Sequence, residues 1–549
     1  MMEYIVLALL SLTAFIFIYN SHYKWTYLFA ISLFALFFGL MLMLSAQWQR
    51  ALNFSAVLFI ILMLFHRLKI HYYKQPLLIS DFWLSFDPRN WETLLHYKGA
   101  LYGVIGLFAL LGYGVMGWSS AESLPSWVRL AGFTLMFIAG YLIVHYSKNP
   151  DAIKVWLDSL PDDGRDVFLN IPISCRGVWF KVPEFTGDSD YFRQKMATLS
   201  AYPISEQKPD IVAFLCESTC NPHQFDLKNA MLPPLAMFES QSNCLFHSPL
   251  RVHTYAGATW MSEFAFLGGV PSTDFGAMAS SVFYSVAPHL RVSFLKSLQA
   301  QGYYCVALSP FTKGNYNAKQ AYDHLGIDLM LQPQDLGYPA PKGKNLWHIS
   351  SQEMVDYAKQ ILERKSIPAL AQFDKPLFVY VLTMREHGPY QHNVADTYQI
   401  AQSGFNALAT SEINDYINRL VDLDKAITDL DDYLQQRNQP YVFAYFGDHQ
   451  VGLGGQMMPM KYTYPQPNYV TQFTVRSNLN NGFSQQQSFI DLAQAGGVIL
   501  EIAGIKTDEF MQANIAMRKL SKYGLQDCDD PTLLNSYRHY LYTDLKIVQ

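Results

Sequence analysis

The sequence lacks several features that would define whole classes of protein. Its 549 residues carry a formal net charge of only −5, so the charge balance gives no reason to expect nucleic acid as a partner. It contains no internal repeat and no low-complexity tract, which excludes a repeat architecture. At this length, a chain without repeats is expected to hold two or three domains.

Cysteine is scarce and shows no pattern. The six cysteines form no C-x-x-C pair and no recognisable zinc cluster, so they do not predict a structural zinc site. We expect buried free thiols, with one or two disulfides as the alternative if the soluble part lies outside the cytosol. The cysteines are Cys175, Cys216, Cys220, Cys244, Cys305 and Cys528.

Apolar residues are abundant and are concentrated before residue 147. They form five long runs with almost no charge, and a helix needs about 20 apolar residues to cross a bilayer. The first run is preceded by no basic segment and is followed at once by others, so we do not interpret it as a cleaved signal peptide. Residues 1–146 are therefore predicted to form a helical membrane domain of about five spans. The runs are 4–19, 25–45, 51–65, 99–118 and 127–146.

The segment 66–98, between the third and fourth runs, is basic. It includes an amphipathic stretch, 75–84, that we expect to lie along the membrane surface. The basic residues are either an ordinary solvated loop or a surface that attracts anionic lipid head groups. Because cytoplasmic loops are usually the basic ones, this segment taken alone places the C-terminal part of a five-span protein in the cytosol.

The remainder reads as a connector, 147–207, followed by a soluble domain, 208–549. Four short apolar runs without alternation predict parallel strands that are covered on both faces. Helical patterns lie between them, so we predict an α/β sheet whose ligands gather at the carboxyl ends of the strands. The tail after about residue 506 gives no fold prediction. The strands are 209–216, 302–308, 376–382 and 440–446, and the helices are 292–301, 350–364 and 411–437.

Polar residues follow three of these strands. The first strand leads into Glu217-Ser-Thr, the third into Thr383-Met-Arg-Glu-His387-Gly-Pro, and the fourth into Gly447-Asp448-His449. Taken singly, a carboxylate after a strand is often a turn former or a helix cap, and a lone histidine is more often structural than catalytic. Together, carboxylate oxygen and imidazole nitrogen at neighbouring strand ends suit a divalent cation such as Zn²⁺ or Mn²⁺.

In chain order, these motifs and the stretch Thr254-Tyr-Ala-Gly-Ala-Thr259-Trp-Met-Ser-Glu-Phe264 resemble those of the lipoteichoic acid synthase family. That family belongs to the alkaline phosphatase/sulfatase superfamily, includes periplasmic phosphoglycerol transferases and is related to phosphoethanolamine transferases. The resemblance covers about residues 208–505. It implies a sulfatase-like α/β catalytic domain on a multi-pass anchor in the bacterial plasma membrane. It also implies that this domain lies outside the cytosol, against the signal of the basic segment, and we adopt that orientation.

The resemblance also implies roles for individual residues. Thr259 corresponds to the nucleophile, and Glu217, Asp448 and His449 to metal ligands, with the Thr259 hydroxyl as a fourth. His387 corresponds to a group on the substrate side that protonates the leaving alkoxide or activates the acceptor. The metal is Mn²⁺ or Zn²⁺, with Mg²⁺ as a further alternative. Coordination explains the choice of residue, because a threonine hydroxyl is a poor nucleophile until a metal lowers its pKa.

Other residues near these motifs have weaker cases. Thr259 alone could be an ordinary helix N-cap, a reading that is compatible with a nucleophile at a helix start. Thr219 is a rival nucleophile, because it lies closer to Glu217 in the sequence. Ser218 and Glu263 are expected to support the site rather than to react.

One segment departs from the family pattern. The family often carries an aromatic–Asn–Arg sequence whose arginine contacts phosphate, and here Ala318 stands at the arginine position. We expect Tyr316, Asn317 and Lys319 to bind substrate. Lys319 or Lys313 could supply positive charge, although a lysine cannot reproduce a bidentate guanidinium.

The leading hypothesis is a membrane-bound phosphoglycerol transferase. It would move glycerol phosphate from phosphatidylglycerol to an extracytoplasmic glycan or lipid acceptor through Thr259. A phosphoethanolamine transferase acting on a cell-envelope acceptor is the first alternative. A sulfatase is less favoured, because Cys220-Asn-Pro-His-Gln lacks the arginine of the C/S-x-P-x-R motif. A non-catalytic membrane sensor on the same fold would not need an intact set of nucleophile and ligands.

Overall fold

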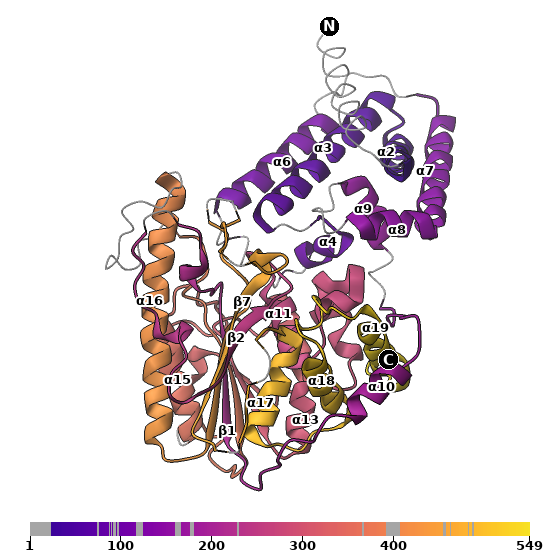
Figure 1. Ribbon diagram of the computed structural model, residues 1–549. Coiled ribbons are helices and arrows are strands. Elements are labelled where there is room, and N and C mark those ends of the chain that lie inside the picture. The colour runs from indigo at the N-terminus through magenta and orange to yellow at the C-terminus, as the bar shows by residue number, and fades with distance from the viewer. Residues whose placement is uncertain are drawn as a thin grey trace. The chain divides into compact units, whose positions relative to one another are not determined.

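The computed structural model places two compact units, Met1–Trp179 and Phe180–Gln549, which are described separately here (Figure 1). It describes residues 24–73, 76–86, 98–116, 124–159, 166–175, 180–227, 230–364, 367–390, 407–453, 457–461, 463–480, 482–485 and 488–549, together with residues 88, 91 and 95.

The first unit is helical. Among its described residues, three helices are long and apolar enough to cross a membrane: Lys24–Ser45, Trp48–His71 and Trp127–Tyr146. They match the second, third and fifth predicted runs. The 19-residue helix α6 coincides with the fourth run, whereas the first run lies outside the described residues. The helices are α2 Lys24–Ser45, α3 Trp48–Tyr73, α4 Ile79–Phe86, α6 Lys98–Met116, α7 Trp127–Tyr146, α8 Pro150–Ser159 and α9 Val167–Ser174.

Helices α2 and α7 pack backbone against backbone. A Cβ atom on Gly132 would lie 2.6 Å from the Met43 nitrogen and 2.8 Å from the Gly39 oxygen, so only glycine permits this crossing. At the end of α2, the Arg129 guanidinium donates hydrogen bonds to the carbonyl oxygens of Met43 and Leu44, at 2.9 and 2.5 Å. These contacts satisfy carbonyl groups that a helix terminus leaves without partners.

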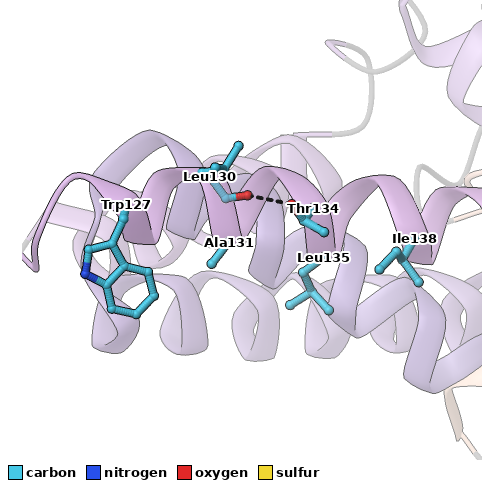
Figure 2. Close-up of a pocket in the computed structure, with 6 residues that line it drawn as sticks. All are labelled: Trp127, Leu130, Ala131, Thr134, Leu135 and Ile138. Atoms are coloured by element: carbon cyan, nitrogen blue, oxygen red, sulfur yellow. Dashed lines mark hydrogen bonds between the residues drawn. The ribbon is translucent and has the colours of Figure 1, made fainter.

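One face of α7 is exposed and apolar. A shallow hollow of about 480 Å³ lies along this face. Figure 2 shows the six residues that line it. The one hydroxyl in this hollow, on Thr134, donates to the Leu130 carbonyl oxygen at 2.9 Å and so presents no unsatisfied donor. This surface suits the hydrocarbon of a bilayer. The hollow is lined by Trp127, Leu130, Ala131, Thr134, Leu135 and Ile138.

The second unit is built on an eight-stranded sheet of order β4-β3-β5-β1-β6-β7-β2-β8. All four predicted strands are present as β1, β3, β5 and β6, parallel and buried in the middle of the sheet. Strand β7 runs antiparallel to both β6 and β2. The strands are β1 Asp210–Cys216, β2 Cys244–Arg251, β3 Tyr304–Leu308, β4 Leu329–Leu331, β5 Leu377–Leu382, β6 Tyr441–Gly447, β7 Val470–Ser477 and β8 Ile490–Asp491.

Helices cover both faces of this sheet, as Figure 1 shows. Alternate residues of β1 point to opposite faces, so Ala213 joins the core under α11, α13, α17 and α18, whereas Phe214 joins the core under α15 and α16. The helices are α10 Asp190–Ala197, α11 Thr259–Gly268, α12 Val282–Ser285, α13 Phe294–Ala300, α14 Ala318–Leu325, α15 Ser351–Glu363, α16 Ala407–Gln436, α17 Ala495–Ala503, α18 Glu509–Leu520 and α19 Pro531–His539.

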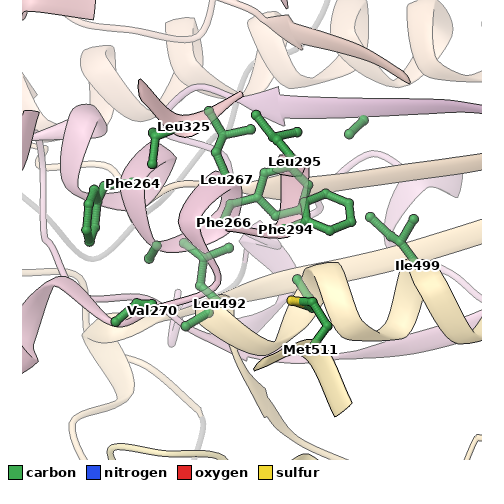
Figure 3. Packing of buried hydrophobic residues seen from close by; sticks show 14 of the residues in the cluster. Phe264, Phe266, Leu267, Val270, Phe294, Leu295, Leu325, Leu492, Ile499 and Met511 are labelled. Atoms are coloured by element: carbon green, nitrogen blue, oxygen red, sulfur yellow. The ribbon is translucent and has the colours of Figure 1, made fainter. Parts of the chain in front are cut away.

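Helix α11 is anchored deep in the larger core. Figure 3 shows Phe264, Phe266 and Leu267 of α11 among side chains from α13, α17 and α18. A helix held by several aromatic side chains gives its first residue a fixed position relative to the sheet. That first residue is Thr259.

The C-terminal tail completes this unit. Helix α19 packs against α10, where Tyr191 donates to Asp530 at 3.0 Å and the Phe192 amide donates to Ser536 Oγ at 3.0 Å. Residues of the predicted connector therefore pack with the soluble domain, and the predicted domain boundaries stay a prediction. All six cysteines, each within the described residues, are free thiols.

Candidate metal centre and nucleophile

The ends of β1 and β6 bring three candidate metal ligands together. Cys216 pairs with Gly447, so the residues that follow, Glu217 and Asp448, leave the sheet side by side. His449 Nε2 lies 3.3 Å from Glu217 Oε1 and 3.2 Å from Asp448 Oδ2. One ligand atom from each residue falls within 4.8 Å of the others, and all three residues are buried. This spacing fits a single ion.

The electrostatics of the cluster favour a cation. Burial and the charge of Glu217 raise the pKa of Asp448 to about 8. Burial alone would raise the pKa of Glu217, but the adjacent positive charge of His449 lowers it to about 2. Burial lowers the pKa of His449, but the carboxylates outweigh it and raise it to about 9. The raised pKa values mean that Asp448 and His449 bind protons, which offset the negative charge of the buried carboxylates. A divalent cation bound here would offset the same negative charge.

The remaining hydrogen bonds orient these groups. Asp448 Oδ1 accepts the backbone N–H groups of Ser218 and His449, at 2.8 and 2.9 Å. His449 Nδ1 lies 3.0 Å from the Gln450 carbonyl oxygen, so Nδ1 keeps its proton and Nε2 is the nitrogen that a metal ion would bind in place of a second proton. Asp448 Oδ2 and His449 Nε2 are buried and make no hydrogen bond of acceptable geometry to the described residues. The donor set therefore fits a metal ion.

Thr259 stands beside the cluster. Its Oγ1 donates to Glu217 Oε2 at 3.0 Å, and the residue is half-buried. The N-cap residue, Ala258, supplies no capping side chain to the first turn of α11. Open N–H groups at a helix start attract anions such as phosphate. The rival Thr219 is buried and donates to the Glu217 carbonyl oxygen at 2.9 Å.

The backbone before Thr259 is held in an uncommon conformation. Ala256, Gly257 and Ala258 have φ values of 54°, 152° and 65°. Left-handed φ angles cost about 1 kcal/mol or more for a residue with a side chain, and the surrounding structure must impose them. Strained backbone of this kind is common at functional sites, where it fixes the position of a reactive side chain.

Gly447 permits the close approach of the end of β6 to the loop that follows β1. A Cβ atom at this position would lie only 1.7 Å from the Thr219 carbonyl oxygen. The first residue of the Gly447-Asp448-His449 motif therefore has a steric role, and the other two are candidate metal ligands.

His387 follows β5 and reaches the same edge of the sheet. The Glu217 amide donates to Thr383 Oγ1 at 3.1 Å, so the loop that carries His387 leaves the sheet beside Glu217. Burial is the largest influence and lowers the pKa of His387, which favours the neutral imidazole. Its Nδ1 lies 2.6 Å from the Gly388 carbonyl oxygen, and its ring meets Trp347 edge-on at 5.6 Å.

The three predicted substrate residues have different surroundings. Tyr316 stacks on Trp260, the residue after Thr259, with ring centroids 4.6 Å apart. Asn317 is buried and donates to the Phe283 carbonyl oxygen at 3.1 Å. Lys319 forms an ion pair with Asp323 at 2.5 Å. Tyr316 thus lies next to Thr259, the candidate nucleophile, and the substrate-binding role of all three stays a prediction.

Helix α16 contributes supporting residues that no sequence motif had indicated. Tyr416 donates to the Ser218 carbonyl oxygen at 2.8 Å and accepts the Cys220 amide at 3.1 Å. Arg419 donates to the carbonyl oxygens of His387 and Pro389, at 2.5 and 3.0 Å. The available signal was Asp415, four residues before Arg419, with which it forms a buried ion pair at 2.7 Å.

The buried carboxyl group of Glu263 connects α11, the helix that begins at Thr259, to neighbouring elements. Glu263 of α11 accepts hydrogen bonds from Tyr322 of α14 and, at 3.0 Å, from Tyr380 of β5. Burial raises the pKa of Glu263 to about 7. Glu263 therefore links α11, which begins at Thr259, to α14, which contains Lys319, and to β5, which leads into the loop of His387. These links are those expected of a supporting residue.

Comparisons with known proteins agree with this architecture. The Sulfatase family model matches residues 245–505. A Haemophilus influenzae protein described as uncharacterized is 62% identical over 552 residues, covering 100% of both chains. The phosphoglycerol transferase GacH of Streptococcus pyogenes, solved with sn-glycerol-1-phosphate, is 18% identical, with a TM-score of 0.52 over 66% of this chain and 95% of that one. The phosphoethanolamine transferase EptA of Neisseria meningitidis is 12% identical, with a TM-score of 0.46 over 90% and 98%.

The cluster lies at the strand ends of a sulfatase-like α/β domain, and three of the described helices that precede this domain are long and apolar enough to cross a membrane. Residues 245–505 form a Sulfatase-family domain, and the chain belongs to one family with its full-length Haemophilus relative. The predicted family and fold class are confirmed.

Proposed function

We propose that this protein is a membrane-bound phosphoglycerol transferase. One observation carries the proposal: a half-buried threonine hydroxyl at an uncapped helix start lies 3.0 Å from a carboxylate of a buried Glu–Asp–His cluster. A non-catalytic sensor would have no need of a nucleophile placed against a metal site.

Glu217, Asp448 and His449 would hold the metal, with Thr259 Oγ1 as a fourth ligand. A divalent cation bound there would polarise the phosphoryl oxygens and lower the pKa of the threonine hydroxyl. Residues of the chain itself bind the phosphate and orient the attacking oxygen. The first turn of α11 presents N–H groups to the phosphate, and the hydrogen bond to Glu217 aims Thr259 Oγ1.

The transfer would proceed in two displacements. In the first, the Thr259 Oγ–P bond forms as the P–O bond to diacylglycerol breaks, Thr259 loses its proton and the diacylglycerol oxygen gains one. In the second, an acceptor hydroxyl attacks phosphorus and forms a new O–P bond as the Thr259 Oγ–P bond breaks. The acceptor hydroxyl loses its proton, and Thr259 Oγ regains one. Atoms and charges balance over the cycle.

His387 is best suited to the second displacement. Burial favours its neutral form, which accepts a proton from an acceptor hydroxyl. The bonds from Arg419 to the carbonyl oxygens around it fix the loop on which it stands. We assign it the role of base toward the acceptor.

Phosphatidylglycerol is the proposed donor, and phosphatidylethanolamine is the alternative. The basic segment 66–98 would enrich an anionic lipid by about 1 kcal/mol for each exposed basic residue, although Lys69 is already paired with Asp81 at 2.7 Å. Ala318 weighs against this donor, because it removes a guanidinium. GacH, which shares the fold, was solved with a glycerol phosphate.

The donor experiment uses the full chain with Mn²⁺ or Zn²⁺ and vesicles of either phospholipid. Diacylglycerol release from phosphatidylglycerol and a glycerophosphoryl adduct on Thr259 by intact mass are the expected results. Thr259→Ala should abolish both, and Thr219→Ala is the matched control that should keep them. Release from phosphatidylethanolamine alone would overturn the donor. An active Thr259→Ala variant would overturn the nucleophile.

The proposed function requires the soluble unit to face away from the cytosol. A reporter fused after Gln549 tests this requirement. Alkaline phosphatase activity of the fusion is expected, whereas fluorescence of a reporter that matures only in the cytosol would contradict the orientation.

A further inference from the structure

Three loops meet on the His387 side of the candidate site. They are 310–313 after β3, 342–348 before α15, and 383–387 after β5. The first two are joined by hydrogen bonds, from the Leu346 amide to the Pro310 carbonyl oxygen at 2.9 Å and from the Thr312 amide to Asn345 Oδ1 at 2.7 Å. The second and third are joined by the Arg385 guanidinium, which donates to the His348 carbonyl oxygen at 3.1 Å. They therefore form one surface.

Aromatic contacts connect this surface to the proposed base. Phe311 meets Trp347 edge-on at 5.0 Å, and Trp347 in turn meets His387 at 5.6 Å. His387 belongs to the loop whose Thr383 Oγ1 accepts the Glu217 amide at 3.1 Å, so this loop lies against the cluster. Whatever the surface binds is therefore held beside the imidazole.

The surface is strongly positive in a chain whose net charge is −5. Lys313, Lys342 and Lys344 are exposed, Arg385 is half-buried, and none of the four forms an ion pair with a residue that the structure describes. The three loops contain one acidic residue, Glu386, which is fully buried.

The acidic residues nearest to these loops along the chain use their carboxylates to cap the helices to which they belong. Asp335 accepts the backbone N–H of Gln332 at 2.9 Å, and Glu353 accepts that of Ser350 at 3.0 Å. Each belongs to a capping box at the start of its own helix. The positive charge of the loops therefore faces solvent.

We propose that Lys313, Lys342, Lys344 and Arg385 form an acceptor-binding surface, and that the acceptor is an anionic saccharide carrying phosphate or carboxylate groups. This proposal rests on the proposed function and names the chemistry of its second substrate. Point charges on lysine and a planar guanidinium on Arg385 suit such groups, and the half-buried Trp347 gives a sugar ring an amphipathic neighbour.

An anionic membrane surface would also attract these residues, but their position favours the acceptor. The donor phosphate must reach Thr259 and the first turn of α11, whereas the basic loops surround the group that meets the acceptor hydroxyl. A surface that holds the acceptor increases the effective concentration of that hydroxyl at His387.

The test separates the two displacements, using the full chain in phosphatidylglycerol nanodiscs with Mn²⁺. The variant is Lys313→Gln/Lys344→Gln/Arg385→Gln, and the matched control is Lys506→Gln/Lys522→Gln/Lys546→Gln, at exposed lysines elsewhere in the unit. The acceptors are an oligogalacturonide and a neutral malto-oligosaccharide of the same length. Transfer to each acceptor is measured in one assay. Diacylglycerol release in the absence of any saccharide acceptor is measured in another.

The wild type should transfer preferentially to the oligogalacturonide, and the preference should shrink as salt rises. The variant should raise KM for this acceptor about tenfold while leaving diacylglycerol release unchanged, and the control should change neither. Equal KM values for the two acceptors, or an unchanged variant, would overturn the proposal. So would a variant that loses binding to anionic vesicles while its transfer is intact, since the loops would then be a membrane contact.

A direct binding measurement keeps this proposal distinct from the proposed function. If the wild type releases no diacylglycerol, the transferase assignment fails, and calorimetric titration of the oligogalacturonide still decides the surface. Binding that the variant loses and the control keeps would support an anionic-saccharide site. Absence of binding to the wild type would overturn it.

Discussion

Replacing Gly447 by alanine tests whether the candidate metal cluster depends on the close approach of the end of β6 to the loop that follows β1. The new Cβ would lie 1.7 Å from the Thr219 carbonyl oxygen, whereas Cβ atoms essentially never come within 3.0 Å of another heavy atom. The two backbones must therefore separate by at least 1.3 Å, the difference of these distances. Both partners are main chain, so no side chain can rotate away to relieve the contact.

The magnitude follows from this displacement. Overpacking of a core costs about 1–3 kcal/mol, and a clash between backbones belongs at the upper end, about 3 kcal/mol. With an unfolding entropy of about 2.1 cal/mol/K per residue over Phe180–Gln549, the melting temperature should fall by roughly 4 °C. Metal ligation tolerates only about 0.2 Å, so metal affinity should fall by about a hundredfold or more.

Calorimetric titration with Mn²⁺ or Zn²⁺ and thermal melting of the full chain measure both effects. Gly482→Ala is the control, because its φ is +74° and no atom lies within 4 Å of the added Cβ. It should cost about 1 kcal/mol of backbone strain and leave metal affinity unchanged. If Gly447→Ala binds metal as the wild type does and melts within about 1 °C of it, the steric reasoning is wrong.

Three further outcomes are expected. Asp448→Asn and His449→Ala should each lose stoichiometric metal by elemental analysis as well as activity, and retained metal would contradict the ligand assignment. Burial raises the pKa of Glu263 from 4.5 to about 7, so its contribution to stability is complete below pH 4.5 and is lost as pH rises through 7. Denaturant titrations should show a shallower decline between pH 5 and 8 in Glu263→Gln, and parallel profiles would refute this. Gly132→Leu should destabilise the membrane unit in detergent, whereas Gly106→Leu, with nothing within 4 Å, should not.

The central strands were predictable because burial on both faces leaves an unbroken apolar run. Strand β2 was not, because Cys244–Arg251 contains Pro249, His247 and a buried Arg251 and has no such run. Arg251 is tolerated in the interior through its ion pair with Asp527 at 2.6 Å, a partner 276 residues away. No local pattern records a contact of that kind.

The same distinction applies to the site. Glu217, Asp448 and His449 could be associated from the sequence, because each follows a predicted strand and parallel strands end at one edge. Tyr416 and Arg419 could not, because they look like ordinary residues of an amphipathic helix. Their importance arises from where α16 lies against the loops, which is decided by packing over the whole domain.

Helix α16 holds the loop of Ser218 and the loop of His387 from one turn of one rigid rod. The distance between the Ser218 loop and the His387 loop is therefore set by a single helix and does not depend on contacts between the loops themselves. Sequence change in the segments that face the solvent can alter what is bound without disturbing that spacing. A lineage carrying this fold is thus free to exchange substrates while its reaction stays the same.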